Sequence, residues 1–262
     1  MIKYKTYVLK RMNMPFTISL VNNKFDETLV VALNQIIDEI DKYFKNVEEK
    51  FSPFLSNSLV SKHTDIGEVL QENFFDFEYQ EVYSRSILAK RDTNGLFDPF
   101  FEGKYNPTGF VKGWAIETAF MRYIKPLIDN NIIEAGAING AGDMQVGTSS
   151  DSDFSWQIGI ENPEDRGKII AKYSIKNGAV ATSGISKKGQ HIKSDNEIKH
   201  VQITVVGTYL SDVDVLATIG VATDENTWRE IIEKNKLFGI LLTKEGIKRV
   251  FEEGKIIDVE RT

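Results

Sequence analysis

The chain has 262 residues, of which 41% are apolar and 27% charged, so it can bury a core of its own. This length fits one large domain or two closely associated subdomains. The formal net charge of −6 disfavours a nucleic-acid partner, because such partners usually require a basic face. The absence of cysteine excludes disulfides, thiolate metal sites and a cysteine nucleophile.

The N-terminal residues lack the apolar stretch and the cleavage site of a signal peptide, and no lipidated cysteine is present. No window of about 18 apolar residues occurs anywhere in the sequence. We therefore expect a cytoplasmic protein with no membrane-spanning segment. The sequence leaves open whether copies of the chain form a homo-oligomer.

The N-terminal half begins with alternating apolar residues, which predict strands over residues 4–9 and 16–20 with a turn near Asn13. Apolar residues at helical spacing then predict a long amphipathic helix from Asp26 to about Phe51. A loop with Pro53 follows, because proline cannot continue a helix. Residues 64–90 indicate mixed helix.

Turn signals predict a loop from Gly103 to Gly113, followed by a central helix over residues 111–129. The remaining residues are mostly strand-like, with two helices over residues 212–222 and 225–233. The expected strands cover residues 132–138, 144–146, 156–160, 169–175, 179–182, 201–206 and 239–243. Helices first and strands later indicate an α+β fold with a largely antiparallel sheet region.

Two loop-like segments in the middle of the chain are candidates for binding an anion. The first, GFVKGWA at residues 109–115, joins a glycine-bearing loop to a helix, so free backbone N–H groups and Lys112 could meet a phosphate. An ordinary junction between a loop and a helix is the simpler interpretation of this segment.

The second segment, NGAGDM at residues 139–144, allows a ligand to approach the backbone closely and offers Asp143 as an acceptor. A plain hairpin turn is its simpler interpretation.

Two further segments carry polar groups next to small residues. The segment NGAVATSG at residues 177–184 is followed by a polar loop with His191, which could act as a base near neutral pH or lie unused on the surface. In VDVLAT at residues 213–218, Asp214 and Thr218 are four residues apart and share a helix face. A carboxylate with a hydroxyl suits Mg²⁺, although a solvated polar stripe would have the same spacing.

Taken together and in this order, these segments resemble the bacterial FAD:protein FMN transferases, the ApbE family. The similarity runs from about residue 8 to residue 245. Three further segments match motifs of the family more weakly, namely MNMPFTI, FSPFLSNSLVSK and LFDP. The resemblance implies a single ApbE-like flavin transferase domain over residues 1–262, which two intimate subdomains could build.

By this resemblance, the activity is Mg²⁺-dependent transfer of the FMN half of FAD to a threonine hydroxyl of an acceptor flavoprotein, with release of AMP. FAD is then a substrate and Mg²⁺ the cofactor. The resemblance implies a catalytic base at His191 and metal ligands at Asp214, Thr218 and a backbone carbonyl near Gly109. It also implies FAD contacts from Met12, Lys112, Asp143, Thr182 and Ser183.

The sequence departs from the family pattern after the histidine, where residues 190–195 read QHIKSD and the family's Pro-Arg-Thr-Gly is missing. Two alternatives to a transferase therefore stay open. Water could replace the acceptor threonine, which would make the protein an FAD pyrophosphatase that produces FMN and AMP. The protein could also bind FAD without chemistry, although storage requires neither a base nor a metal.

Overall fold

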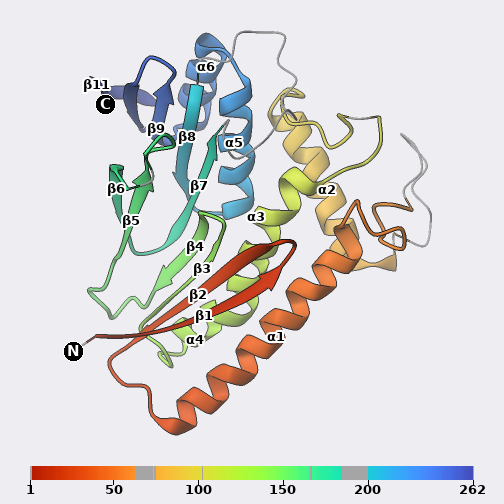
Figure 1. The fold of residues 1–262 in the computed structure, drawn as a ribbon, viewed down its shortest axis with the longest axis vertical. Coiled ribbons are helices and arrows are strands. Elements are labelled where there is room, and N and C mark those ends of the chain that lie inside the picture. The colour runs from red at the N-terminus through yellow and green to blue at the C-terminus, as the bar shows by residue number, and fades with distance from the viewer. Residues whose placement is uncertain are drawn as a thin grey trace. The chain divides into compact units, whose positions relative to one another are not determined.

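The fold was analysed in a computed structural model, which describes residues 2–62, 73, 75–101, 103–165, 167–184 and 200–261. The chain forms two compact units, Met1–Phe154 and Ser155–Thr262. Each combines helices with antiparallel strands (Figure 1), which confirms the predicted α+β class.

The sheet of the first unit consists of β1 (Lys3–Arg11), β2 (Met14–Asn22), β3 (Ala135–Gly140) and β4 (Asp143–Thr148). The strands lie in the order β1-β2-β3-β4 and every neighbour is antiparallel. Phe16, Ile18 and Leu20 alternate along β2 and have no exposed surface, so one face of this strand belongs to the core.

Both hairpins of this sheet close through two-residue turns. Met12 and Asn13 join β1 to β2 with φ values of 50° and 57°, and Ala141 and Gly142 join β3 to β4 with 55° and 102°. Two central residues with positive φ match the right-handed twist of the flanking strands. The simpler interpretation of residues 139–144 as a hairpin turn is therefore confirmed.

The long amphipathic helix predicted from the sequence is α1 (Glu27–Phe51). It begins where expected, because the side chain of Asp26 accepts a hydrogen bond from the backbone N–H of Leu29 at 2.9 Å. One face is buried and comprises Leu33, Ile37, Ile40, Tyr43, Phe44, Val47 and Phe51. The ring of Phe44 stacks on Phe16 of β2 with centroids 4.2 Å apart, which packs this helix onto the sheet.

The central helix differs from its prediction. It begins at Thr108 as α3 (Thr108–Ala119), continues as a π-helical turn, η2 (Phe120–Ile124), and ends in α4 (Lys125–Asp129). Two glycines of β3 admit this helix closely: a Cβ at Gly140 would lie 2.6 Å from Ile116, and one at Gly136 would lie 2.3 Å from Ile124. A side chain at either position would therefore require these isoleucines, or the helix that carries them, to shift.

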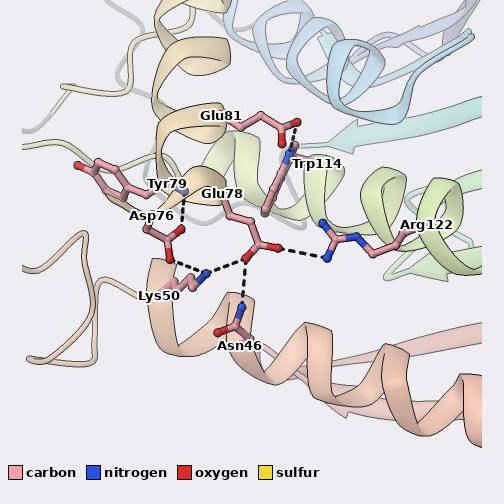
Figure 2. Close-up of polar contacts among 8 residues, drawn as sticks. All are labelled: Asn46, Lys50, Asp76, Glu78, Tyr79, Glu81, Trp114 and Arg122. Carbon is pink, nitrogen blue, oxygen red and sulfur yellow. Dashed lines mark hydrogen bonds and ion pairs between the residues drawn. The ribbon is translucent and has the colours of Figure 1, made fainter. Parts of the chain in front are cut away.

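A polar network joins α2 (Phe77–Asp92) to the neighbouring helices (Figure 2). The carboxylate of Glu78 accepts hydrogen bonds from Lys50 at 2.9 Å, Asn46 at 3.1 Å and Arg122 at 3.3 Å. Burial lowers the pKa of Lys50, but hydrogen bonds to Asp76 and Glu78 outweigh it and leave that pKa raised. Glu78 therefore holds α2 against α1 and η2 through charged hydrogen bonds.

The second unit contains the ribbon of β5 (Trp156–Glu161) and β6 (Ile169–Ile175), and a series of antiparallel strands from β7 to β11. These strands are β7 (Gly178–Gly184), β8 (His200–Gly207), β9 (Phe238–Thr243), β10 (Ile247–Glu252) and β11 (Lys255–Arg261). Helix α5 (Leu210–Ala222) packs on β7 and β8, and α6 (Glu225–Asn235) follows it.

Several boundaries differ from those predicted. The loop expected from Gly103 to Gly113 ends at Thr108, and the strand expected from residue 132 begins at Ala135. Strands β10 and β11 were not predicted at all. In the described part of the chain, no helix is both long enough and apolar enough to cross a membrane.

Replacing Glu78 with Gln should destabilise the first unit by about 1–2 kcal/mol, because hydrogen bonds to charged groups are worth about that much when partly buried. The side chain of Glu78 is 16% exposed. The control is Glu39→Gln, whose side chain is 56% exposed and pairs with Lys42 on the helix surface. Urea unfolding of the full chain should give a clear loss for Glu78→Gln and about 0.5 kcal/mol or less for the control. If both variants lose the same free energy of unfolding, Glu78 has no special role in stability.

Candidate functional site

The structure brings Lys112 and Asp143 together in the first unit. The ammonium group of Lys112 on α3 contacts the carboxylate of Asp143, which opens β4 directly after the hairpin turn. The Asp143 side chain is 2% exposed and that of Lys112 is 24% exposed. A buried carboxylate requires such a partner, since an isolated buried charge is very costly. Lys112 reaches solvent on its other side, where it could meet an anionic ligand.

Packing of α3 on β3 produces this pair. Ile116 lies over Gly140, and Gly140 is the register partner of Asp143 across the hairpin. Lys112 precedes Ile116 by four residues, so both lie on the same face of the helix. The close approach at Gly140 thus places Lys112 one helical turn further along, next to Asp143.

Gly109 lies in the first turn of α3 and not in the loop predicted for it. A Cβ at this position would lie 3.3 Å from the ring of Phe97, so glycine permits close packing here. Its carbonyl has two lone pairs, so a hydrogen bond within the helix leaves one available to a cation. The metal contact expected of Gly109 stays a prediction.

In the second unit, α5 and β7 form another polar group. Asp214 and Thr218 lie four residues apart on α5, and Asp214 is only 2% exposed. The hydroxyl of Thr218 lies 3.3 Å from that of Ser183 on β7. A buried carboxylate and two hydroxyls therefore gather where this helix packs on the strand.

Thr182 does not join this group. Successive residues of a strand point to opposite faces, and Thr182 lies on the face opposite Ser183. Its hydroxyl is 2.9 Å from that of Thr204, its register partner on β8. Of the two neighbours predicted to bind the same ligand, Ser183 contacts Thr218 of α5, and Thr182 contacts Thr204 of β8.

The carboxylate and hydroxyl oxygens of α5 are of the chemical type that binds a magnesium ion. Mg²⁺ is usually held by one or two carboxylates together with waters and substrate phosphates, and not by a cage of protein ligands. Within the ranges described, no cluster of three or more His, Asp or Glu side chains could hold a metal ion. Asp214 with Thr218 is thus a partial ligand set, which a carbonyl and phosphate oxygens would have to complete.

The predicted base, His191, lies outside the described residues. The nearby His200 is described, and it is buried at 1% exposure at the start of β8. Its Nδ1 atom is 2.9 Å from the carbonyl oxygen of Gly220, and burial lowers the pKa of this imidazole. His200 is therefore held in the interior and is poorly placed to take a proton from an incoming molecule.

Met12 occupies the turn between β1 and β2 and is partly exposed, with φ at 50°. Its side chain is thus not part of the core. The turn lies at the end of the sheet that also carries Asp143, because Phe16 pairs with Gly140 and Gly140 with Asp143.

Two residues near these groups escaped the sequence reasoning. The side chain of Asn106 accepts hydrogen bonds from the backbone N–H and the hydroxyl of Thr108, and so secures the start of α3. An asparagine commonly accepts a hydrogen bond from the backbone two residues on and so closes a turn, so this residue could have been found. Thr204, the partner of Thr182, depends on the β7–β8 register, which no local motif reveals.

Solved structures with the same fold extend over nearly the whole chain. The flavin transferase ApbE from Vibrio cholerae has a TM-score of 0.71 at 17% identity, covering 93% of this chain and 94% of that one. The apo flavinyl transferase ApbE from Pseudomonas stutzeri has 0.73 at 13% identity, with 95% of each chain covered. The ApbE protein from Thermotoga maritima has 0.73 at 16% identity, covering 99% and 97%.

At the level of sequence, no curated protein matches the chain significantly. A sequence model of the ApbE family matches residues 104–241, which is more than half of the chain. This range begins just before α3 and extends into β9, so it includes Lys112, Asp143, Ser183 and the α5 residues. The chain belongs to the ApbE family.

Proposed function

We propose that this protein transfers the FMN half of FAD to a threonine hydroxyl of an acceptor flavoprotein and releases AMP. One observation carries the proposal. The buried carboxylate of Asp214 shares a helix face with Thr218, whose hydroxyl is 3.3 Å from that of Ser183. A hard-oxygen group of this kind suits the cation of a phosphoryl transfer, and family membership and the fold of flavin transferases support the same reaction.

In this reaction, the threonine oxygen forms a bond to the phosphorus of the FMN half. The bond between that phosphorus and the bridging oxygen breaks, so the AMP phosphate leaves with the electron pair. When bound, Mg²⁺ would neutralise the charge on the pyrophosphate oxygens. Asp214 and Thr218 would hold it. His191 would accept the proton of the threonine hydroxyl.

Lys112, Asp143 and Ser183 would contribute to holding FAD, with Met12 and Thr182 as further contacts. The ammonium group of Lys112 is neutralised by Asp143 yet partly exposed, so it can attract a phosphate without leaving its partner. Such prearranged charges need little reorganisation when the substrate arrives.

Asp214→Asn should reduce AMP release from FAD at least about 100-fold, because even residues that only orient metal ligands cost about 10–100-fold. The control is Asp212→Asn on the same helix, which is exposed and should retain activity. Calorimetric titration with Mg²⁺ in the presence of FAD supplies a second readout. Undiminished Mg²⁺ binding by Asp214→Asn would contradict the metal assignment.

His191→Ala should bind FAD normally and transfer flavin about 10²–10⁴-fold more slowly, as expected for loss of a general base. The control is His200→Gln, since His200 is buried against the Gly220 carbonyl and has no proposed part in the chemistry. Single-turnover transfer can be followed by the mass of the acceptor. A large loss in the control with none in His191→Ala would assign the base to His200.

The reaction class is tested by incubating the protein with Mg²⁺ and FAD, with and without a threonine-bearing acceptor domain. The acceptor should gain the mass of one FMN unit. Because the sequence after His191 lacks the family's Pro-Arg-Thr-Gly, we also expect slow hydrolysis of FAD without acceptor, as water competes for the same phosphorus. AMP and FMN without a labelled acceptor would favour a pyrophosphatase. Bound FAD with no product in either tube would indicate a storage protein.

A further inference from the structure

The N-terminal residues carry a charge opposite to that of the rest of the chain. Residues 1–25 include five basic residues and no acidic one, so a charge of +5 here stands against −11 in the remainder, which together give −6. Three of these basic residues, Lys3, Lys5 and Lys10, lie on β1 and form no ion pair with the described residues. Arg11, at the end of the strand, is paired with Asp41 of α1.

β1 is also the outer strand of its sheet. It pairs with β2 on one side and ends the strand order on the other. None of its nine residues is buried, and Tyr4 and Val8 on its outward face are 61% and 59% exposed. An edge strand of this kind presents unpaired backbone N–H and C=O groups to an incoming chain.

We propose that β1 binds an acidic, extended segment of the acceptor protein, which adds to the sheet as a further strand. The partner's apolar side chains would lie beside Tyr4 and Val8 on one face, and its carboxylates beside Lys3 and Lys5 on the other, because side chains alternate along a strand. A second copy of this chain does not fit, because two β1 edges would place like charges opposite each other. Lysines on an edge discourage self-pairing while they remain attractive to an acidic strand.

The position of β1 suits such a role. Its C-terminal end, at Arg11, lies at the same end of the sheet as Asp143, because Arg11 pairs with Met14, Phe16 with Gly140 and Gly140 with Asp143. The added strand would lie four strand spacings from β4, which corresponds to about 19 Å. A few extended residues beyond the added strand could therefore bring a threonine towards the Lys112–Asp143 pair. This step rests on the proposed function, whereas strand addition itself does not.

The test uses the full chain without FAD or Mg²⁺, so its failure is distinguishable from failure of the transferase. The probes are two fluorescent 12-residue peptides in which valine or threonine alternates with glutamate in one and with lysine in the other. Only the glutamate peptide should raise the fluorescence anisotropy on binding the native chain. Its binding should slow amide hydrogen exchange over residues 3–11, which distinguishes strand addition from loose ionic attraction.

Two matched variants each replace three lysines with glutamate, one on β1 and the other on the second unit. Lys3→Glu/Lys5→Glu/Lys10→Glu should bind the glutamate peptide at least about tenfold more weakly and should gain affinity for the lysine peptide. Lys168→Glu/Lys234→Glu/Lys244→Glu, at exposed positions of the second unit, should bind as the native chain does. The proposal is overturned if the native chain does not bind the glutamate peptide, if binding leaves exchange over residues 3–11 unchanged, or if both variants weaken it equally.

Discussion

The arrangement of the first unit depends on the lack of side chains at Gly136 and Gly140. These positions let the helix that begins at Thr108 lie directly against β3, with Ile116 and Ile124 as its contacts. From that contact follows the position of Lys112 beside Asp143. A polar pair at the edge of the core is thus set by apolar packing, and the buried carboxylate remains tolerable because the packing delivers its counter-charge.

The second unit reaches a comparable result by a different route. A Cβ at Gly220 would lie 2.9 Å from the ring of Trp228 and 3.1 Å from Ile203, so glycine again allows tight packing around a helix. Here the helix is α5, and its contact with β7 places Thr218 near Ser183. In both units, part of the proposed site lies on a helix whose position is fixed by close contact with a strand: Lys112 on α3, and Asp214 with Thr218 on α5. Such sites are held more precisely than sites on loops.

Much of this fold was predictable where one local signal dominates. Asp26 marks the start of α1 and the apolar spacing its buried face, and both were predicted correctly. Gly109 and Gly113 misled the prediction, because they resemble turn signals but lie within α3. The strands β10 and β11 were missed because charged residues interrupt their alternation. At the site, Asp214 and Thr218 could be paired from helical spacing, whereas the separation of Thr182 from Ser183 required the strand register.

The π-helical turn η2 explains how one helix can touch β3 twice. Ile116 and Ile124 are eight residues apart, and in a regular α-helix the second would point about 80° away from the first. A π turn absorbs one extra residue, which returns both side chains to nearly the same direction. Removing one residue between the two isoleucines, or adding one, would therefore turn the second side chain about 100° away and put the two contacts out of phase.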